Sequence, residues 1–137
     1  MSESIGPGTK PGDSSAFKGR RGFRRLVNAT RYSMDGLAAA WRHENAFRQE
    51  LVLAAVLLPV ALLLPLPGVE KVVLVTSLLL VLIVELLNTA IEVAVDRDSV
   101  EIDPLAKRAK DYGSAAVMIA LLVAGMAWLT ILGSHYL

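Results

Sequence analysis

The 137-residue sequence contains no cysteine, and only 20% of its residues are charged. The absence of cysteine excludes disulfide bonds, cysteine-ligated zinc, iron–sulfur clusters and thiol nucleophiles. Any metal or catalytic chemistry must therefore use oxygen and nitrogen atoms. Three common signatures are also missing: the phosphate-binding loop G-x-x-x-x-G-K-[ST], a G-x-G-x-x-G that follows a strand, and the zinc motif H-E-x-x-H.

Hydrophobic residues make up 54% of the chain, which is too apolar for an ordinary small soluble domain and indicates a membrane protein. The length allows one compact unit. The formal net charge of +1 predicts no nucleic-acid binding. The distribution of charge is uneven, because nine of the 14 lysines and arginines precede Leu51.

The N-terminal part of the chain divides into two segments of different composition. Residues 1–22 are rich in glycine, serine, proline and lysine, which predicts a disordered tail without a secretory signal. From Phe23 to His43, apolar residues recur at steps of three and four, with arginines opposite. A helix packed on a soluble core is one interpretation. The strongly apolar sequence that follows favours an amphipathic helix at a membrane surface.

Three apolar stretches follow, over residues 47–67, 72–95 and 112–132. About 20 apolar residues are needed for a helix to cross the hydrocarbon core of a bilayer. The second stretch reaches that length only if Glu85 and Glu92 are accepted within or near the membrane. The sequence thus predicts an all-α membrane protein, with three transmembrane helices and an N-terminal amphipathic surface helix, in one domain over residues 23–137.

The distribution of basic residues predicts the orientation in the membrane. The N-terminal region carries nine of them and residues 96–111 carry four, whereas the segment after Leu132 carries none. By the positive-inside rule, the N-terminus and the second loop are cytoplasmic. The C-terminus is then on the opposite side.

The second apolar stretch carries polar side chains on one face. At about 100° per residue, Glu85, Asn88, Glu92 and Asp96 fall within an arc of roughly 80°. Carboxylates inside a membrane are costly and mark functional sites by default. The alternative is that they only hold neighbouring helices together.

Ionisable residues of all three spans are expected at the cytoplasmic membrane face. Glu44 and Glu50 flank the first span, and Lys110 and Asp111 precede the third. Clustered carboxylates suit Mg²⁺, which binds through one or two of them together with substrate phosphates. A neighbouring lysine could neutralise a phosphate. Phosphoryl transfer between a cytosolic nucleotide and a lipid is therefore a reasonable hypothesis.

Three runs of residues resemble the small integral-membrane diacylglycerol kinases of Gram-negative bacteria. The resemblance covers residues 22–136, and its motifs are Ala46-Phe47-Arg48-Gln49-Glu50, Glu85-Leu86-Leu87-Asn88-Thr89-Ala90-Ile91-Glu92, and Ala109-Lys110-Asp111-Tyr112-Gly113-Ser114-Ala115-Ala116-Val117.

This resemblance implies a homotrimer in the bacterial inner membrane that transfers the γ-phosphate of MgATP to diacylglycerol, giving phosphatidic acid. The site would be shared between neighbouring subunits at the cytoplasmic interface. Glu85 would be the general base, and a base must be ionised, so the rate would rise with pH. Glu44 and Glu92 would bind Mg²⁺. The resemblance further implies contacts with ATP from Arg25, Tyr32, Glu44, Asn88, Glu92, Asp96, Lys110 and Asp111, and with the lipid from Ser33, Glu50 and Glu85.

Two other functions stay open. Undecaprenol kinases share the Glu-x-x-Asn and Lys-Asp elements, although Phe47-Arg48-Gln49-Glu50 and the Gly113-Ser114-Ala115-Ala116-Val117 run favour the diacylglycerol kinases. A non-enzymatic oligomer could also conduct ions along the buried carboxylates. However, residues 72–84 offer only Thr76 and Ser77 as polar groups, so half of this helix would be dry.

Overall fold

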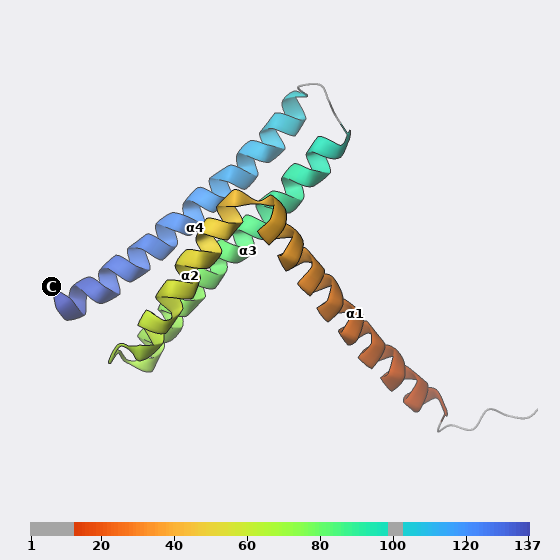
Figure 1. The fold of residues 1–137 in the computed structure, drawn as a ribbon, viewed down its shortest axis with the longest axis horizontal. Coiled ribbons are helices and arrows are strands. Elements are labelled where there is room, and N and C mark those ends of the chain that lie inside the picture. Colours follow the sequence, from red (N-terminus) through yellow and green to blue (C-terminus); the bar gives the residue numbers. More distant parts are fainter. Residues whose placement is uncertain (1–12, 99–102) are drawn as a thin grey trace, which may run out of the picture. The chain divides into compact units, whose positions relative to one another are not determined.

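The computed structural model describes residues 13–98 and 103–137, and within them every regular element is a helix. The described residues form four helices, which are labelled in Figure 1: α1 (Asp13–His43), α2 (Asn45–Leu63), α3 (Gly68–Asp98) and α4 (Pro104–Tyr136). The last three are long and apolar enough to cross a membrane. The predicted all-α fold, with three candidate spans after an N-terminal helix, is confirmed.

Several helices extend beyond their predicted limits. α1 begins at Asp13, so residues 13–22 are helical where the composition predicts a disordered tail. The strong helix breakers nearest to the start of α1 are Pro11 and Gly12. A helix formed by the amphipathic residues from Phe23 onward can therefore extend toward the N-terminus as far as Asp13. Residues 1–12 of the predicted tail lie outside the described residues.

α4 also begins well before the predicted start of its span at residue 112. Asp103 caps it, with its side-chain oxygen accepting a hydrogen bond from the backbone N–H of Leu105 at 3.0 Å, and Pro104 occupies the first turn. The first two turns of α4 therefore carry charged residues on a continuous helix. This extension gives Lys110 and Asp111 a rigid backbone.

The chain divides into an N-terminal unit that ends at Ala39 and a second unit over Ala40–Leu137, each described here by itself. In the second unit the helix breaks at Glu44, whose backbone is extended. Arg48 stabilises the break, because its guanidinium donates to the carbonyl oxygens of Trp41 at 3.0 Å and Arg42 at 3.1 Å. These carbonyls end a helix and lack partners within it. The break fixes Glu44 at the beginning of α2.

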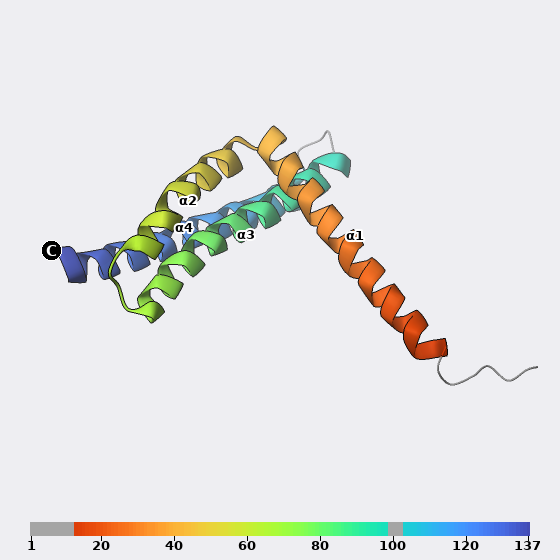
Figure 2. The same ribbon diagram turned by 60° about the horizontal axis from the view of Figure 1, so that its bottom comes forward.

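α3 packs against both α2 and α4 (Figure 2). Small residues of α2, Ala54 and Ala61, are buried against α3, which lets the helices approach closely. Many large apolar side chains instead point outward, as on a helix bundle that faces lipid or another subunit. Only 17–33% of each candidate span is buried inside the chain.

A buried hydrogen bond joins α3 and α4 in the apolar part of the second unit. Trp128 Nε1 donates to Ser77 Oγ at 3.1 Å, and Ser77 Oγ donates to the carbonyl oxygen of Leu74 at 2.7 Å. Both side chains are nearly inaccessible to solvent. The indole N–H has no water to bind if Ser77 is removed.

We expect Ser77→Ala to lower the free energy of unfolding by about 0.5–1.5 kcal/mol, because it leaves the Trp128 N–H unpaired. The measurement is titration with a denaturing detergent in mixed micelles. Thr76→Val is the matched control, since Thr76 is exposed on the same helix and its loss should cost under about 0.5 kcal/mol. Equal effects of the two variants would contradict the role given to Ser77.

Candidate active site

One face of α3 carries four of the predicted site residues in a graded order of burial. The exposed fraction is 5% for Glu85 and 9% for Asn88, whereas Glu92 is half-buried and Asp96 exposed. Asn88 Nδ2 donates to Glu92 Oε1 at 3.4 Å, across one turn of the helix. Polar groups therefore continue from the protein interior to its surface along a single rigid element.

Glu85 is surrounded by carboxyl groups from three segments of the second unit. Its side chain lies next to that of Glu50 on α2. Glu92 and Glu44 lie close enough to interact electrostatically with Glu85. The structure thus brings Glu85 together with residues that lie 35 and 41 positions earlier in the sequence.

The carboxylates of the described residues do not enclose a metal ion by themselves. Among the residues that the structure describes, no three carboxylate or imidazole groups lie close enough to hold a metal ion. Mg²⁺ does not need such a cage, because it usually binds through one or two carboxylates and completes its shell with water and phosphate oxygens. The hard oxygen atoms of Glu44 and Glu92 fit an ion that arrives with a phosphate ligand.

Two buried oxygen atoms of this cluster accept no hydrogen bond within the described residues. They are Oε2 of Glu50 and Oδ1 of Asn88. Buried polar atoms are nearly always paired in folded proteins, so an unpaired one calls for an explanation. Donors for these atoms must come from outside the described part of this chain, such as a substrate hydroxyl, a solvent molecule or a second subunit.

Lys110 connects the start of α4 to the end of α3. Its ammonium group contacts Asp96 Oδ1 at 2.7 Å, and both groups are accessible to solvent. The predicted site residue Asp111 is instead paired with Lys107 on its own helix, also at 2.7 Å. The two lysines therefore differ in their partners, since only Lys110 bridges two helices.

This difference gives a prediction for the two lysines of α4. We expect Lys110→Met to lower kcat/KM for ATP by about tenfold or more, because the variant removes the cation beside the acidic face. Lys107→Met removes an exposed cation in an i,i+4 pair, which is worth only about 0.3–0.5 kcal/mol. Steady-state assays over a range of ATP concentrations compare the variants. Equal losses would contradict a specific role for Lys110.

Gly113 is where α4 comes closest to the polar face of α3. A Cβ atom at this position would overlap Asn88 Oδ1 and come within 3.6 Å of Ile91 Cδ1. Nothing in the residue pattern assigned a role to Gly113, although it lies in one of the quoted motifs. One feature of the sequence could have indicated its role: a glycine inside a predicted helix. Such a glycine lowers helix stability by about 1 kcal/mol relative to alanine, so close packing at that position is a reason to expect it.

The remaining predicted residues, Arg25, Tyr32 and Ser33, belong to the N-terminal unit. All three are exposed on α1, and Ser33 Oγ donates to the backbone carbonyl of Ala29 at 2.9 Å. The structure brings Glu44, Glu50, Glu85, Asn88 and Glu92 together, and it pairs Asp96 with Lys110. The three α1 residues are described only within their own unit.

An apolar cavity of about 240 Å³ lies between the three spans, beside Glu50. Side chains from α2, α3 and α4 line it: Leu53, Ala54, Leu57, Leu78, Val81, Leu121, Ala124, Gly125 and Trp128. Glu50 is the single charged residue of this lining. The carboxyl cluster is therefore next to a space suited to a hydrocarbon group.

Three apolar spans with a carboxyl cluster on α3 define the chain as a multi-pass membrane protein with an acidic site. The sequence model described as "Prokaryotic diacylglycerol kinase" matches residues 31–132, and the chain belongs to this family. It is 53% identical to the diacylglycerol kinase of Pseudomonas aeruginosa over 118 residues, which are 86% of this chain and 96% of that protein.

Two further relatives agree. The identity is 48% over 115 residues to the diacylglycerol kinase of Escherichia coli K12, covering 84% of this chain and 94% of the relative. The identity is 44% over 108 residues to a diacylglycerol kinase of Helicobacter pylori, covering 79% of this chain and 84% of the relative. The resemblance seen in the motifs is thus confirmed over most of the chain.

Proposed function

We propose that the protein is a diacylglycerol kinase that transfers the γ-phosphate of MgATP to the primary hydroxyl of diacylglycerol, giving phosphatidic acid and ADP. The observation that carries this proposal is the buried Glu85, next to Glu50 and one turn from Asn88, in a chain of this family. The lipid oxygen forms a bond to the γ-phosphorus, and the bond between that phosphorus and the β,γ-bridging oxygen breaks. The hydroxyl proton passes to the carboxylate of Glu85.

Glu85 suits the role of general base because of its position. A base must lie within hydrogen-bond reach of the proton that it accepts, in a place that substrate can reach and bulk water enters little. Glu85 is buried next to Glu50, and Glu50 lines the apolar cavity, which would hold part of an acyl chain. Glu50 and Asn88 each offer a free acceptor oxygen to orient the lipid headgroup.

The polar face beyond Glu85 suits the nucleotide. Glu44 and Glu92 would hold Mg²⁺ together with phosphate oxygens, and the ion would neutralise charge on the transferring group. Lys110, fixed by Asp96, supplies a cation near the surface end of this face. In phosphoryl transfer, such positioning and electrostatic stabilisation account for most of the catalysis. Arg25, Tyr32 and Asp111 are proposed to contact ATP and Ser33 the lipid, on the resemblance alone.

We further propose that the site is completed between subunits of a homotrimer, with the N-terminus in the bacterial cytoplasm. The two unpaired acceptors within the described residues support a contribution from a neighbour. The apolar outer faces support burial against lipid and other subunits. Native mass spectrometry from detergent tests the stoichiometry, and an excess of basic residues on the N-terminal side supports the orientation.

The experiment that tests the function is transfer of labelled γ-phosphate from ATP by the purified protein in mixed micelles. Short-chain diacylglycerol and undecaprenol are compared, with Mg²⁺ present or chelated. We expect label on diacylglycerol that depends on Mg²⁺. Label on undecaprenol alone would favour the other lipid kinase, and the absence of label on both lipids would overturn the proposal. The ion-conducting alternative gains no support, since Ser77 is enclosed by Trp128 in the apolar half of α3.

A further inference from the structure

The first half of α1 carries a dense positive charge, most of it before the part of the chain that matches the family model. Residues 18–34 contain six lysines and arginines and no aspartate or glutamate, and the family match begins at residue 31. The cations in this stretch are Lys18, Arg20, Arg21, Arg24, Arg25 and Arg31. A charge of this density needs a partner of opposite sign that is present where the protein works.

The arginines follow a regular arrangement on the helix. At about 100° per residue, Arg20, Arg24 and Arg31 lie within an arc of roughly 40°. This stripe borders the apolar one formed by Phe23, Val27 and Met34, whose side chains are exposed. Within the described residues, none of the three arginines forms an ion pair.

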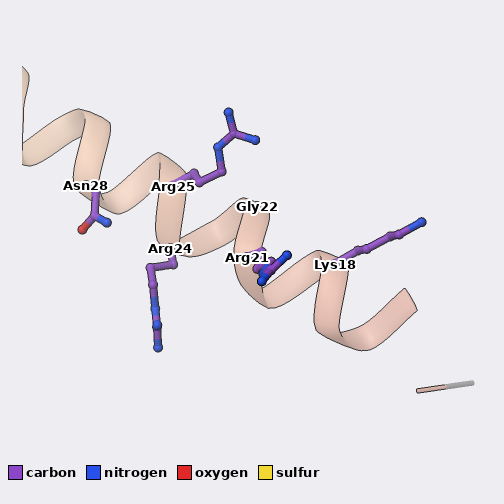
Figure 3. A pocket seen from close by; sticks show the side chains of 6 residues that line it. All are labelled: Lys18, Arg21, Gly22, Arg24, Arg25 and Asn28. Carbon is purple, nitrogen blue, oxygen red and sulfur yellow. The ribbon is translucent and has the colours of Figure 1, made fainter. Parts of the chain in front are cut away.

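A hollow of about 630 Å³ lies on the same segment at Gly22, and Figure 3 shows the side chains that line it. Lys18 and Arg25 extend to one side of the helix and Arg24 to the other. Arg21 and Asn28 also line the hollow. At about 100° per residue, Gly22 and Arg25 lie roughly 120° and 180° around the helix from the apolar stripe. The hollow therefore faces away from that stripe, and the cations beside the apolar side chains are Arg20, Arg24 and Arg31.

We propose that the stripe of Arg20, Arg24 and Arg31 on α1 binds the phosphate headgroups of anionic phospholipids in the bilayer that holds the spans. The apolar stripe would enter the boundary between headgroups and acyl chains, and the long arginine side chains beside it would extend up to the phosphates. Each cation near an anionic membrane surface adds to the binding, and the contributions fall with salt. Anionic lipid, rather than lipid in general, is then the partner of this segment.

The test uses the full-length protein in lipid nanodiscs of two compositions, phosphatidylcholine alone and phosphatidylcholine with about 30% phosphatidylglycerol. Amide hydrogen exchange is measured for peptides covering residues 18–34. We expect exchange to slow by about tenfold when the anionic lipid is present, and the effect to weaken near 0.5 M salt, where the Debye length is only a few ångströms (about 4 Å).

Two variants with equal loss of charge separate this binding from a general effect of charge. Arg20→Gln combined with Arg24→Gln should lose most of the response to phosphatidylglycerol. Arg97→Gln combined with Arg108→Gln removes two cations elsewhere and should keep it. Both proteins are first checked for kinase activity in phosphatidylcholine, so that a folding defect is recognised. Inorganic phosphate added to phosphatidylcholine discs should give no protection.

Three outcomes would overturn the proposal. Equal exchange in the two lipid compositions would show that headgroup charge does not affect the binding of α1. This holds even if α1 is protected from exchange in both compositions. An equal loss in the two paired variants would show a non-specific charge effect. Protection by inorganic phosphate would identify a free anion as the ligand. None of these results depends on phosphate transfer, so the proposed kinase activity is tested separately.

Discussion

We expect Glu85→Gln to lower kcat for diacylglycerol phosphorylation by about a hundredfold to ten-thousandfold. Glutamine has nearly the shape of glutamate, but it cannot accept the proton of the lipid hydroxyl. The packing around residue 85 should therefore survive. A large loss in kcat with little change in the free energy of unfolding is the pattern of a general base.

The pH dependence gives an independent test of the same assignment. A general base acts only when it is ionised, so the wild-type rate should rise with pH until Glu85 is fully ionised and then level off. The residual activity of Glu85→Gln should lack this step. Rates are measured at saturating substrates, so that the profile reports the enzyme–substrate complex.

Glu70→Gln is the control for removing a carboxylate from α3. Glu70 lies in the first turn of the helix, where its Oε2 is 2.6 Å from Nε2 of His135. This contact connects the start of α3 to the end of α4. It lies 15 residues along α3 from Glu85. Activity close to wild type is expected for Glu70→Gln. Normal turnover by Glu85→Gln would remove Glu85 from the role of base.

Much of the fold follows from the sequence because membrane spans are set by local composition. Three apolar stretches and a stop at Pro65 and Pro67 are sufficient to predict the helices, since a bilayer leaves the backbone few other options. The ends of the helices were less predictable. α4 begins at Pro104 because Asp103 caps it, and this capping depends on one side chain rather than on the apolar pattern.

The candidate site was predictable in part. Helical periodicity places Glu85, Asn88 and Glu92 on one face, and the structure pairs the last two. The partner of Glu85 could not be found in this way, because Glu50 lies on another helix and only packing decides its distance. For the same reason the sequence does not show that Asp111 pairs with Lys107. Long-range contacts depend on how the helices dock, which local patterns do not encode.

Gly113→Ala should have a large effect for a residue without any functional group. The added methyl group would overlap Asn88 Oδ1, so either α4 moves away from α3 or the Asn88 amide turns. Both changes disturb the hydrogen bond from Asn88 to Glu92. We expect kcat to fall by about a hundredfold, as for a misplacement of about 1 Å near the reacting groups. Overpacking should also cost about 1–3 kcal/mol in the free energy of unfolding.

A matched control and a second variant separate the steric cause from a general effect of alanine. Gly133 lies on the same helix with nothing within 4 Å of an added Cβ atom, so Gly133→Ala should leave activity and stability nearly unchanged. Combining Gly113→Ala with Asn88→Ala removes the clash, so we expect stability to recover while activity stays low, because the amide is gone. Unfolding titrations and kinetics on the wild type, Gly113→Ala, Asn88→Ala and the double variant give the coupling between residues 113 and 88. Additive effects would mean that the small residue at 113 serves helix packing in general and not the position of the Asn88 amide.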